Sequence, residues 1–238
     1  MRVLGIDTAT AAGGVALVED VRLIAEECWE IAAVHSERLV PAIAGVLEAA
    51  GWQGSDLGAI AVSAGPGSYT GLRIGVTVAK ALAYAWGCKL VGVGTLDALA
   101  WQGRGFEGLI SPLVPSRRGR VYAALYAGNT AAGPPARPVR LAGPEHLPLP
   151  TWLEQVADRR RRTLFIGEPV RALWEEIRAV LGGQAVAGDE GWGPVTLRPA
   201  SVAGWGRELA LAGEEADPFE LVPRYLRRPE AELTWPSD

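Results

Sequence analysis

The 238-residue chain contains only two cysteines, Cys28 and Cys88, and no long uninterrupted hydrophobic run. Two cysteines exclude a disulfide scaffold, and their spacing fits no metal motif, so we expect buried thiols in a reducing compartment. The most apolar stretch, residues 74–88, contains Lys80 and falls short of the roughly 20 residues that span a bilayer. Residues 1–7 already include a carboxylate, so no secretory signal is expected there. These absences predict a cytoplasmic protein without a membrane segment.

An excess of positive charge is also absent. The chain has 23 basic and 27 acidic residues, a net charge of −4, so the protein as a whole is not an electrostatic binder of nucleic acid. The one basic run, Arg159 to Arg162, follows a predicted helix, where a solvated turn is more common than an RNA site. With 49% hydrophobic residues, the composition is that of a globular protein with a sizeable core.

Hydrophobic periodicity in the first hundred residues predicts alternating strands and helices. Ser36 is the expected N-cap of the first helix, and Gly51 its end. The predicted strands are 3–7, 14–18, 21–31, 58–63 and 89–93, and the predicted helices are 36–50, 68–86 and 95–101. The order β-β-β-α-β-α-β-α is that of the ribonuclease-H-like unit of the actin, hexokinase and Hsp70 superfamily. We therefore predict an actin-like, two-lobed α/β fold.

The second half of the chain partly repeats this order in a shorter, degenerate form. Residues 103–108 form the expected joint, which divides the chain into lobes 1–103 and 104–238. The predicted strands are 109–114, 121–126 and 163–166, the predicted helices are 145–157, 170–181 and 200–211, and residues 127–138 and the tail from 223 are expected to be irregular or extended.

Asp7 and Thr8 follow the first predicted strand. In the actin-like superfamily an aspartate here faces a nucleotide phosphate and its metal ion, usually with a glycine two places later that lets backbone N–H groups approach the phosphate. This chain has Ala9 at that place. The alternative is an aspartate that only caps its own turn.

A glycine-rich loop, residues 65–71, joins the fourth predicted strand to a helix. Such a loop can cradle an anion through free N–H groups and the helix dipole. It matches neither the Walker loop nor G-x-G-x-x-G, so a tight turn capped by Ser68 or Thr70 is the alternative. Asp7, Thr8, Gly65 and Gly67 are the candidate residues of a residual nucleotide site.

The two histidines, His35 and His146, do not indicate a metal site. A helical pair of ligands needs histidines at i and i+4, and the residue four places after His35 is Leu39. A surface or capping role is expected for His35, and no metal or cofactor is predicted.

The helix over residues 72–86 has an apolar arc wider than one core requires. One flank, Leu72, Val76, Ala79 and Ala83, is expected to face the sheet of the first lobe. The other flank, Ile74, Val78, Ala81 and Ala85, is a candidate protein interface. The alternative is that the first helix or the second lobe covers it.

These segments together resemble the TsaB (YeaZ) family. The resemblance is carried by residues 6–10, 35–39, 61–75, 91–96, 117–122 and 223–227. It implies an actin-like subunit of the machinery that makes N6-threonylcarbamoyladenosine (t6A) in tRNA. Such a subunit pairs with a TsaD-type catalytic subunit, helps to recruit a TsaE-type P-loop ATPase, forms a homodimer when alone and meets tRNA only through the complex.

Departures from active relatives indicate a non-catalytic protein. Leu39 stands where TsaD relatives have their second metal-binding histidine. Pro115 stands where the TsaB family usually has an aspartate, and Arg120 where glutamate is common. The rival hypothesis is an enzyme, either an ATP-dependent small-molecule kinase or a metallopeptidase. A kinase needs carboxylates from both lobes, and a metallopeptidase needs clustered ligands. The net negative charge of the chain disfavours a simple RNA-binding module.

Overall fold

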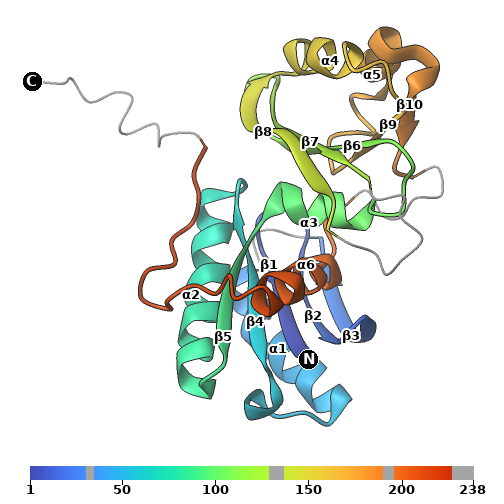
Figure 1. Cartoon of the computed structure of the whole chain (residues 1–238). Helices are drawn as coiled ribbons and strands as arrows, with labels where there is room; N and C mark the ends of the chain where they lie inside the picture. Colours follow the sequence, from blue (N-terminus) through green and yellow to red (C-terminus); the bar gives the residue numbers. More distant parts are fainter. Residues whose placement is uncertain (31–34, 129–136, 190–195, 227–238) are drawn as a thin grey trace, which may run out of the picture.

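The computed structural model describes residues 1–30, 35–128, 137–189 and 196–226. Their strands form two five-stranded sheets (Figure 1). In the first sheet, of order β3-β2-β1-β4-β5, the central strand β1 is antiparallel to β2 and parallel to β4. The strands are β1 (Arg2–Asp7), β2 (Gly13–Glu19), β3 (Arg22–Trp29), β4 (Ala59–Gly65) and β5 (Lys89–Gly94).

The second sheet repeats this arrangement. Its order is β10-β9-β6-β7-β8, with the central strand β6 antiparallel to β7 and parallel to β9. The strands are β6 (Leu109–Pro115), β7 (Arg120–Ala127), β8 (Val139–Pro148), β9 (Thr163–Ile166) and β10 (Ala185–Ala187). The duplicated topology confirms the actin-like two-lobed α/β fold.

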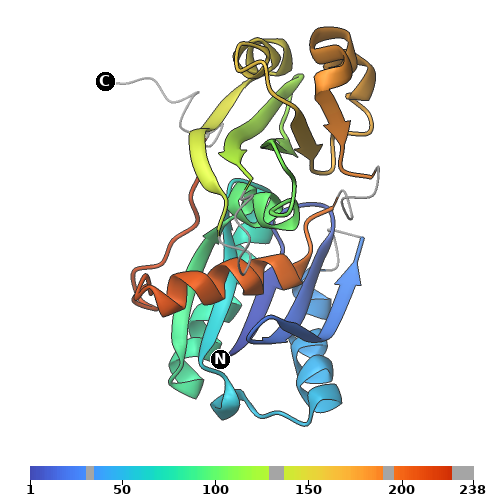
Figure 2. The same cartoon turned by 45° about the vertical axis from the view of Figure 1, so that its right-hand side comes forward.

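The helices form layers on both sides of each sheet (Figures 1 and 2). Two helices cover the outer face of the first sheet, two lie between the sheets, and two cover the outer face of the second sheet. The helices outside the first sheet are α1 (His35–Ala50) and α2 (Tyr69–Trp86). The helices between the sheets are α3 (Thr95–Gln102) and α6 (Pro199–Leu211), and those outside the second sheet are α4 (Leu149–Ala157) and α5 (Trp174–Leu181). Short 3-10 turns cover Gly54–Asp56 and Gly182–Gln184.

Alternation along β1 assigns its side chains to two cores. Leu4 and Ile6 pack in the core beneath α1 and α2, whereas Val3 points toward α3 and α6. The core around α3 and α6 continues into the second sheet through Ile110 and Tyr126. The two lobes therefore share one hydrophobic core.

A buried carboxylate also joins the lobes. Asp97 of α3 accepts hydrogen bonds from the Tyr126 hydroxyl of β7, at 2.7 Å, and from the Arg140 guanidinium of β8. Tyr126 lies edge-on to Trp205 of α6, with ring centres 6.4 Å apart. These contacts hold the second sheet against α3 and α6.

In the first lobe the element order is confirmed, but the predicted N-cap is wrong. Helix α1 begins at His35, so the exposed Ser36 is already inside it. Gly51 ends α1 in a left-handed conformation, as expected, with φ of 66°. Residue 31, the end of the third predicted strand, lies outside the described residues. Cys28 is exposed and Cys88 half-buried, which corrects the expectation of two buried thiols.

In the second half, two predicted helices have wrong starts and two strands were missed. The predicted helix 145–157 starts four residues late, at Leu149, because Glu145 to Pro148 extend β8 along β7. The predicted helix 170–181 starts at Trp174, after a turn. Strands β8 and β10 were not predicted at all. Most of the expected loop 127–138 lies outside the described residues.

The last helix returns to the first lobe. Although α6 belongs to the range 104–238 in sequence, it packs across β1, β2, β4 and β5. Its first turn is held there by Glu26 of β3, which accepts a hydrogen bond from the Ala200 N–H at 3.0 Å and pairs with Arg198. The division into 1–103 and 104–238 stays a proposal, although α6, which belongs to the second range, packs on the sheet of the first. No helix of the described residues is long and apolar enough to cross a membrane.

Candidate functional site

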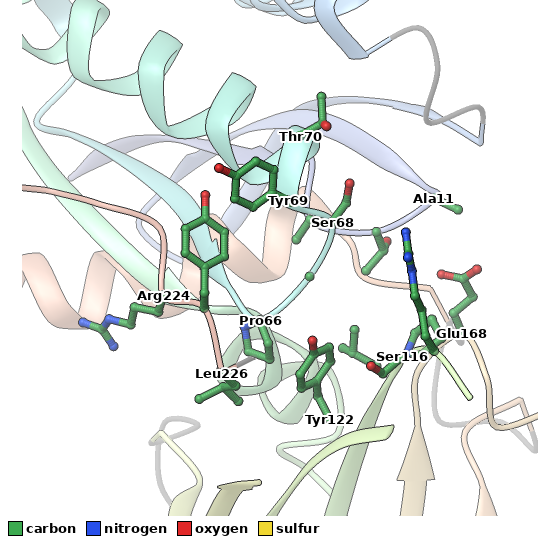
Figure 3. Close-up of a pocket in the computed structure, with 17 residues that line it drawn as sticks. Ala11, Pro66, Ser68, Tyr69, Thr70, Ser116, Tyr122, Glu168, Arg224 and Leu226 are labelled. Atoms are coloured by element: carbon green, nitrogen blue, oxygen red, sulfur yellow. The ribbon is translucent and has the colours of Figure 1, made fainter. Parts of the chain in front are cut away.

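A cleft of about 650 Å³ opens between the lobes, where β1 and β6 end (Figure 3). Ser68 and Tyr69 at the start of α2 face it from the first lobe, and Tyr122 and Glu168 face it from the second. The described residues of the lining are Ala9, Thr10, Ala11, Pro66, Gly67, Ser68, Tyr69, Thr70, Val114, Pro115, Ser116, Arg117, Tyr122, Glu168, Arg224, Tyr225 and Leu226.

The segment after β1 forms hydrogen bonds with polar groups at the start of α2. The Ser68 N–H donates to the Ala9 carbonyl at 2.7 Å, and the Thr8 hydroxyl donates to the Gly71 carbonyl at 2.7 Å. The Ser68 hydroxyl accepts from the Gly71 N–H at 3.2 Å and so caps the helix, as the sequence allowed. The chain itself therefore occupies donors that an anion-binding loop would offer to a phosphate.

Two glycines of the loop are required by close packing. A Cβ atom at Gly67 would lie 2.2 Å from the Ala9 carbonyl oxygen, and one at Gly71 would lie 2.0 Å from the Thr8 carbonyl oxygen. Both distances are far below van der Waals contact. These glycines let α2 approach the segment after β1.

Asp7 is completely buried at the end of β1. Its Oδ1 accepts from the Ala9 N–H at 3.1 Å, while Oδ2 makes no well-formed hydrogen bond within the described part of the chain. Burial raises the pKa of Asp7 to about 6, against the lowering effect of the Ser63 hydroxyl and the N–H groups of Ala9 and Thr8. About half of these carboxyls are thus protonated at pH 6, and roughly a tenth at pH 7.

The four candidate nucleotide-site residues lie together around the start of α2, but only Gly67 lines the cleft. Asp7 and Thr8 are fully buried, and Gly65 is buried where a Cβ atom would come within 2.4 Å of the Arg224 carbonyl oxygen. Their role toward a nucleotide stays a prediction.

His35 is buried, which corrects the expectation of a surface or capping role. Its Nδ1 accepts a hydrogen bond from the Trp29 indole at 2.7 Å, and its Nε2 lies 3.1 Å from the Thr10 carbonyl oxygen. Since Nδ1 accepts, the proton is assigned to Nε2, and both ring nitrogens are engaged. His35 therefore links α1, β3 and the segment after β1.

The second lobe contributes a proline, hydroxyls and one carboxylate to the cleft. Pro115 ends β6, and Glu168 is the one acidic residue among the described residues of the lining. Ser116 Oγ lies 3.0 Å from His146 Nε2, and the His146 ring is tilted by 32° over Tyr122. No sequence motif indicated Glu168, although Tyr122 lies in the segment 117–122 that resembles TsaB.

The last described residues form one wall of the cleft. The Arg224 N–H donates to the Ala64 carbonyl at 2.6 Å, and Tyr225 lies over Tyr69 with ring centres 5.0 Å apart. Further back, Leu221 is buried against the core, and its carbonyl accepts from Lys80 at 3.1 Å. This segment thus runs beside Arg73, Lys80 and Tyr84 of α2, which contact it, and ends at the cleft.

The two flanks of α2 differ as the sequence predicted. Leu72, Val76, Ala79 and Ala83 are all buried in the first lobe. On the candidate interface flank, Ala81 and Ala85 are exposed, whereas Ile74 and Val78 are half-buried and pack against the core. The exposed part of the flank is therefore narrower than the sequence suggested. Among the described residues, no three His, Cys, Asp or Glu side chains gather as metal ligands.

Known proteins resemble this chain in sequence and in structure. A family model described as TsaD, tRNA N6-adenosine threonylcarbamoyltransferase, matches residues 30–137. The tRNA threonylcarbamoyladenosine biosynthesis protein TsaB of Bacillus subtilis is 37% identical over 99% of this chain and 98% of its own length. The protein of the same name from Escherichia coli is 37% identical over 53% of this chain and 55% of its own length.

Solved structures agree with this likeness. A Pseudomonas aeruginosa protein described as similar to peptidase YEAZ has a TM-score of 0.76 at 25% identity, covering 95% of this chain and 99% of its own. The ethanolamine utilization protein EutJ of Carboxydothermus hydrogenoformans has a TM-score of 0.54 at 13% identity, covering 87% of this chain and 90% of its own, and shares the fold alone. With a relative 37% identical along nearly the whole of both chains, this chain belongs to the TsaB (YeaZ) family.

Proposed function

We propose that this chain is a non-catalytic subunit of the machinery that forms t6A in tRNA. In this proposal it pairs with a TsaD-type catalytic subunit and helps to recruit a TsaE-type P-loop ATPase, and tRNA meets it only in the complex. The Bacillus subtilis relative, a tRNA threonylcarbamoyladenosine biosynthesis protein, supports the pathway. A cytoplasmic location follows from the proposal.

One observation carries the non-catalytic part. The place where an actin-like enzyme holds phosphate and metal is filled by the chain itself, because Ser68 N–H binds the Ala9 carbonyl and Asp7 is sealed beneath the segment after β1. Phosphoryl transfer needs open donors and an accessible carboxylate there. No cofactor is proposed.

The rival enzymes are less well supported. A kinase of this fold would draw a second carboxylate from the end of β6, where this chain has Pro115. A metallopeptidase would need His35 as a ligand, and both of its ring nitrogens are already engaged. A residual nucleotide site at Asp7, Thr8, Gly65 and Gly67 would therefore require the segment after β1 to move.

We place the partner interface on the outer face of α2. Ala81 and Ala85 are exposed there beside half-buried Ile74 and Val78, and Val40 of the neighbouring helix α1 is 55% exposed. Small side chains let a partner helix approach closely. The same face would make the homodimer when the partner is absent.

The experiment introduces charge on this face without disturbing the core. Since Ala81 and Ala85 are exposed and glutamate favours helices, the double variant Ala81→Glu/Ala85→Glu should fold normally. We expect it to weaken binding to the TsaD-type partner at least about tenfold, because unpaired carboxylates would be buried at the interface. Size-exclusion chromatography with the partner measures this. Val78→Glu is a poorer choice, since Val78 packs against the core.

The matched control is Val180→Glu on α5, the corresponding helix of the second lobe, where Val180 is 47% exposed. It should leave co-elution unchanged. If the α2 double variant still co-elutes at micromolar concentration, this face is not the interface.

A further inference from the structure

Charge is divided unevenly between the two sheets and their helices. Residues 104–198 carry 13 basic and 9 acidic side chains, a net charge of +4, whereas the rest of the chain carries 10 basic and 18 acidic ones, a net charge of −8. The lobes are larger than the Debye length of about 8 Å at physiological salt, so a polyanion near the second lobe would feel little of the first. The overall negative charge therefore hides a locally basic lobe.

The densest part of this charge is the turn between α4 and β9. Arg159, Arg160, Arg161 and Arg162 are all exposed. The turn lies where β6 and β9 begin, because Leu109 pairs with Thr163, and this is the end of the sheet opposite to Pro115 and the cleft. Its arginines are thus separate from the site described above.

The backbone of this turn is held firmly. The Arg162 carbonyl accepts from the Leu109 N–H at 2.9 Å, and the Arg161 carbonyl accepts from the Thr163 hydroxyl at 3.0 Å. Arg160 has a left-handed backbone with φ of 50°. The guanidinium of Arg162 lies 5.6 Å from the centre of the Phe106 ring. The arginines are presented on a fixed scaffold, which lowers the entropic cost of binding.

These charges are not neutralised within the lobe. In the ranges that the structure describes, no ion pair joins Arg159, Arg160 or Arg161 to a carboxylate. By contrast, Arg140 and Arg198 have carboxylate partners. Unpaired exposed guanidinium groups keep their full capacity for a phosphate ligand.

We propose that the turn Arg159–Arg162 contacts the phosphate backbone of tRNA in the assembled complex. Arginine binds phosphate in a bidentate manner and is weakly hydrated, and the four adjacent exposed guanidinium groups concentrate positive charge that attracts the phosphates of an RNA strand. The inference rests on the proposed function and adds that this chain touches the RNA itself. It assigns no sequence specificity, since phosphate contacts position RNA rather than read it.

The test compares two double variants that remove the same charge from the same lobe. Arg159→Gln/Arg161→Gln neutralises the turn and leaves the left-handed Arg160 in place. Arg171→Gln/Arg178→Gln is the control, since both of these arginines are exposed elsewhere in the lobe. An unmodified tRNA transcript with a fluorescent label is titrated with each full-length protein, alone and with the TsaD-type partner, between 50 and 200 mM salt.

For the turn variant we expect the affinity for tRNA to fall by about tenfold at 100 mM salt. We also expect the plot of log K against log salt to become less steep by about 1.5 in slope, because two phosphate contacts are lost. The control should change the affinity by less than about twofold and leave the slope unchanged. Equal losses in both variants, or no loss in the turn variant, would overturn the proposal. So would loss of partner co-elution with unchanged tRNA affinity, which would indicate an acidic protein ligand. Failure of the proposed function is distinguishable, because the wild-type chain would then not co-elute with the partner.

Discussion

The two lobes have the same strand order but different chemistry where their central strands end. In the first lobe β1 ends on Asp7, which is fully buried, and in the second β6 ends on Pro115, which is exposed. The strand beside each leads into a similar turn, since Gly65 at the end of β4 has φ of 113° and Gly167 after β9 has φ of 129°. The second lobe repeats the backbone arrangement of the first, but it has no acidic residue at the end of its central strand.

The helices that follow these turns differ as well. Helix α2 has 18 residues and is packed closely on the segment after β1, whereas α5 has 8 residues and begins only after a further turn. A fold can thus be kept by its hydrophobic cores while the groups that would act on a ligand are replaced. In this family member the well-formed edge of the first lobe supports packing, and we propose that its outer face supports association.

The largest effect is expected from breaking the close approach of α2. Gly71→Val would place a side chain 2.0 Å from the Thr8 carbonyl oxygen, so α2 or the segment after β1 must shift. We expect the free energy of unfolding to fall by about 3 kcal/mol, at the upper end of overpacking effects. Gly183→Val in the second lobe is the control, because a Cβ atom there meets no neighbour within 4 Å. Urea unfolding of both variants measures the difference, and equal losses would contradict this role of the glycine.

A somewhat smaller effect is expected from removing the buried charge of Asp7. Its pKa is raised from 3.8 to about 6 in the folded chain, so the ionised form destabilises the fold. This destabilisation is absent below about pH 4, grows between pH 4 and 6 and is complete above pH 6, where it reaches about 3 kcal/mol. Asp7→Asn should therefore be more stable than the wild type at pH 7.5 by up to that amount.

At pH 3.5 the two proteins should have nearly equal stability, because the wild-type carboxyl is then protonated in both the folded and the unfolded state. Urea unfolding at both pH values gives the comparison. A constant difference between Asp7→Asn and the wild type over this range would show that Asp7 titrates normally. The second lobe offers no counterpart, since Pro115 has no titratable group.

Sequence alone predicted the first lobe well because its strands are apolar and its helices have clear periodicity. The second lobe was predicted less well for identifiable reasons. Strand β8 carries Pro144 and Pro148 and lies half exposed along β7, so it lacks the alternation of a buried strand. Strand β10 has only three residues.

The candidate site was predicted in part. The motifs around Asp7 and Gly65 located the edge of the first sheet, but no local pattern shows that Asp7 is sealed in. That outcome depends on contacts between the segment after β1 and α2, which are more than 50 residues apart in sequence. Glu168 and Tyr225 reach the cleft through tertiary packing, which periodicity does not report.

The smallest effect is expected from removing the hydrogen-bond acceptor of a buried tryptophan, a contact that both lobes contain. The indole N–H of Trp152 donates to Ser111 Oγ at 2.9 Å, as that of Trp29 donates to His35. Ser111→Ala would leave the buried Trp152 N–H without a partner and should cost about 1–2 kcal/mol of unfolding free energy. Ser36→Ala, at an exposed site on α1, should cost less than about 0.5 kcal/mol. Thermal unfolding of both variants tests this, and a neutral Ser111→Ala would indicate a substitute acceptor.

The most direct test of the central claim is the activity of Asp7→Asn. The account holds that Asp7 takes no part in catalysis, so the variant should support t6A formation at the wild-type rate when combined with the TsaD-type and TsaE-type proteins, ATP and threonylcarbamoyl-adenylate. Nucleoside mass spectrometry of the tRNA measures the product, and steady-state assays should detect no ATP hydrolysis by either purified chain alone. ATP hydrolysis by the isolated wild-type chain that disappears in Asp7→Asn would contradict the claim that this chain is non-catalytic.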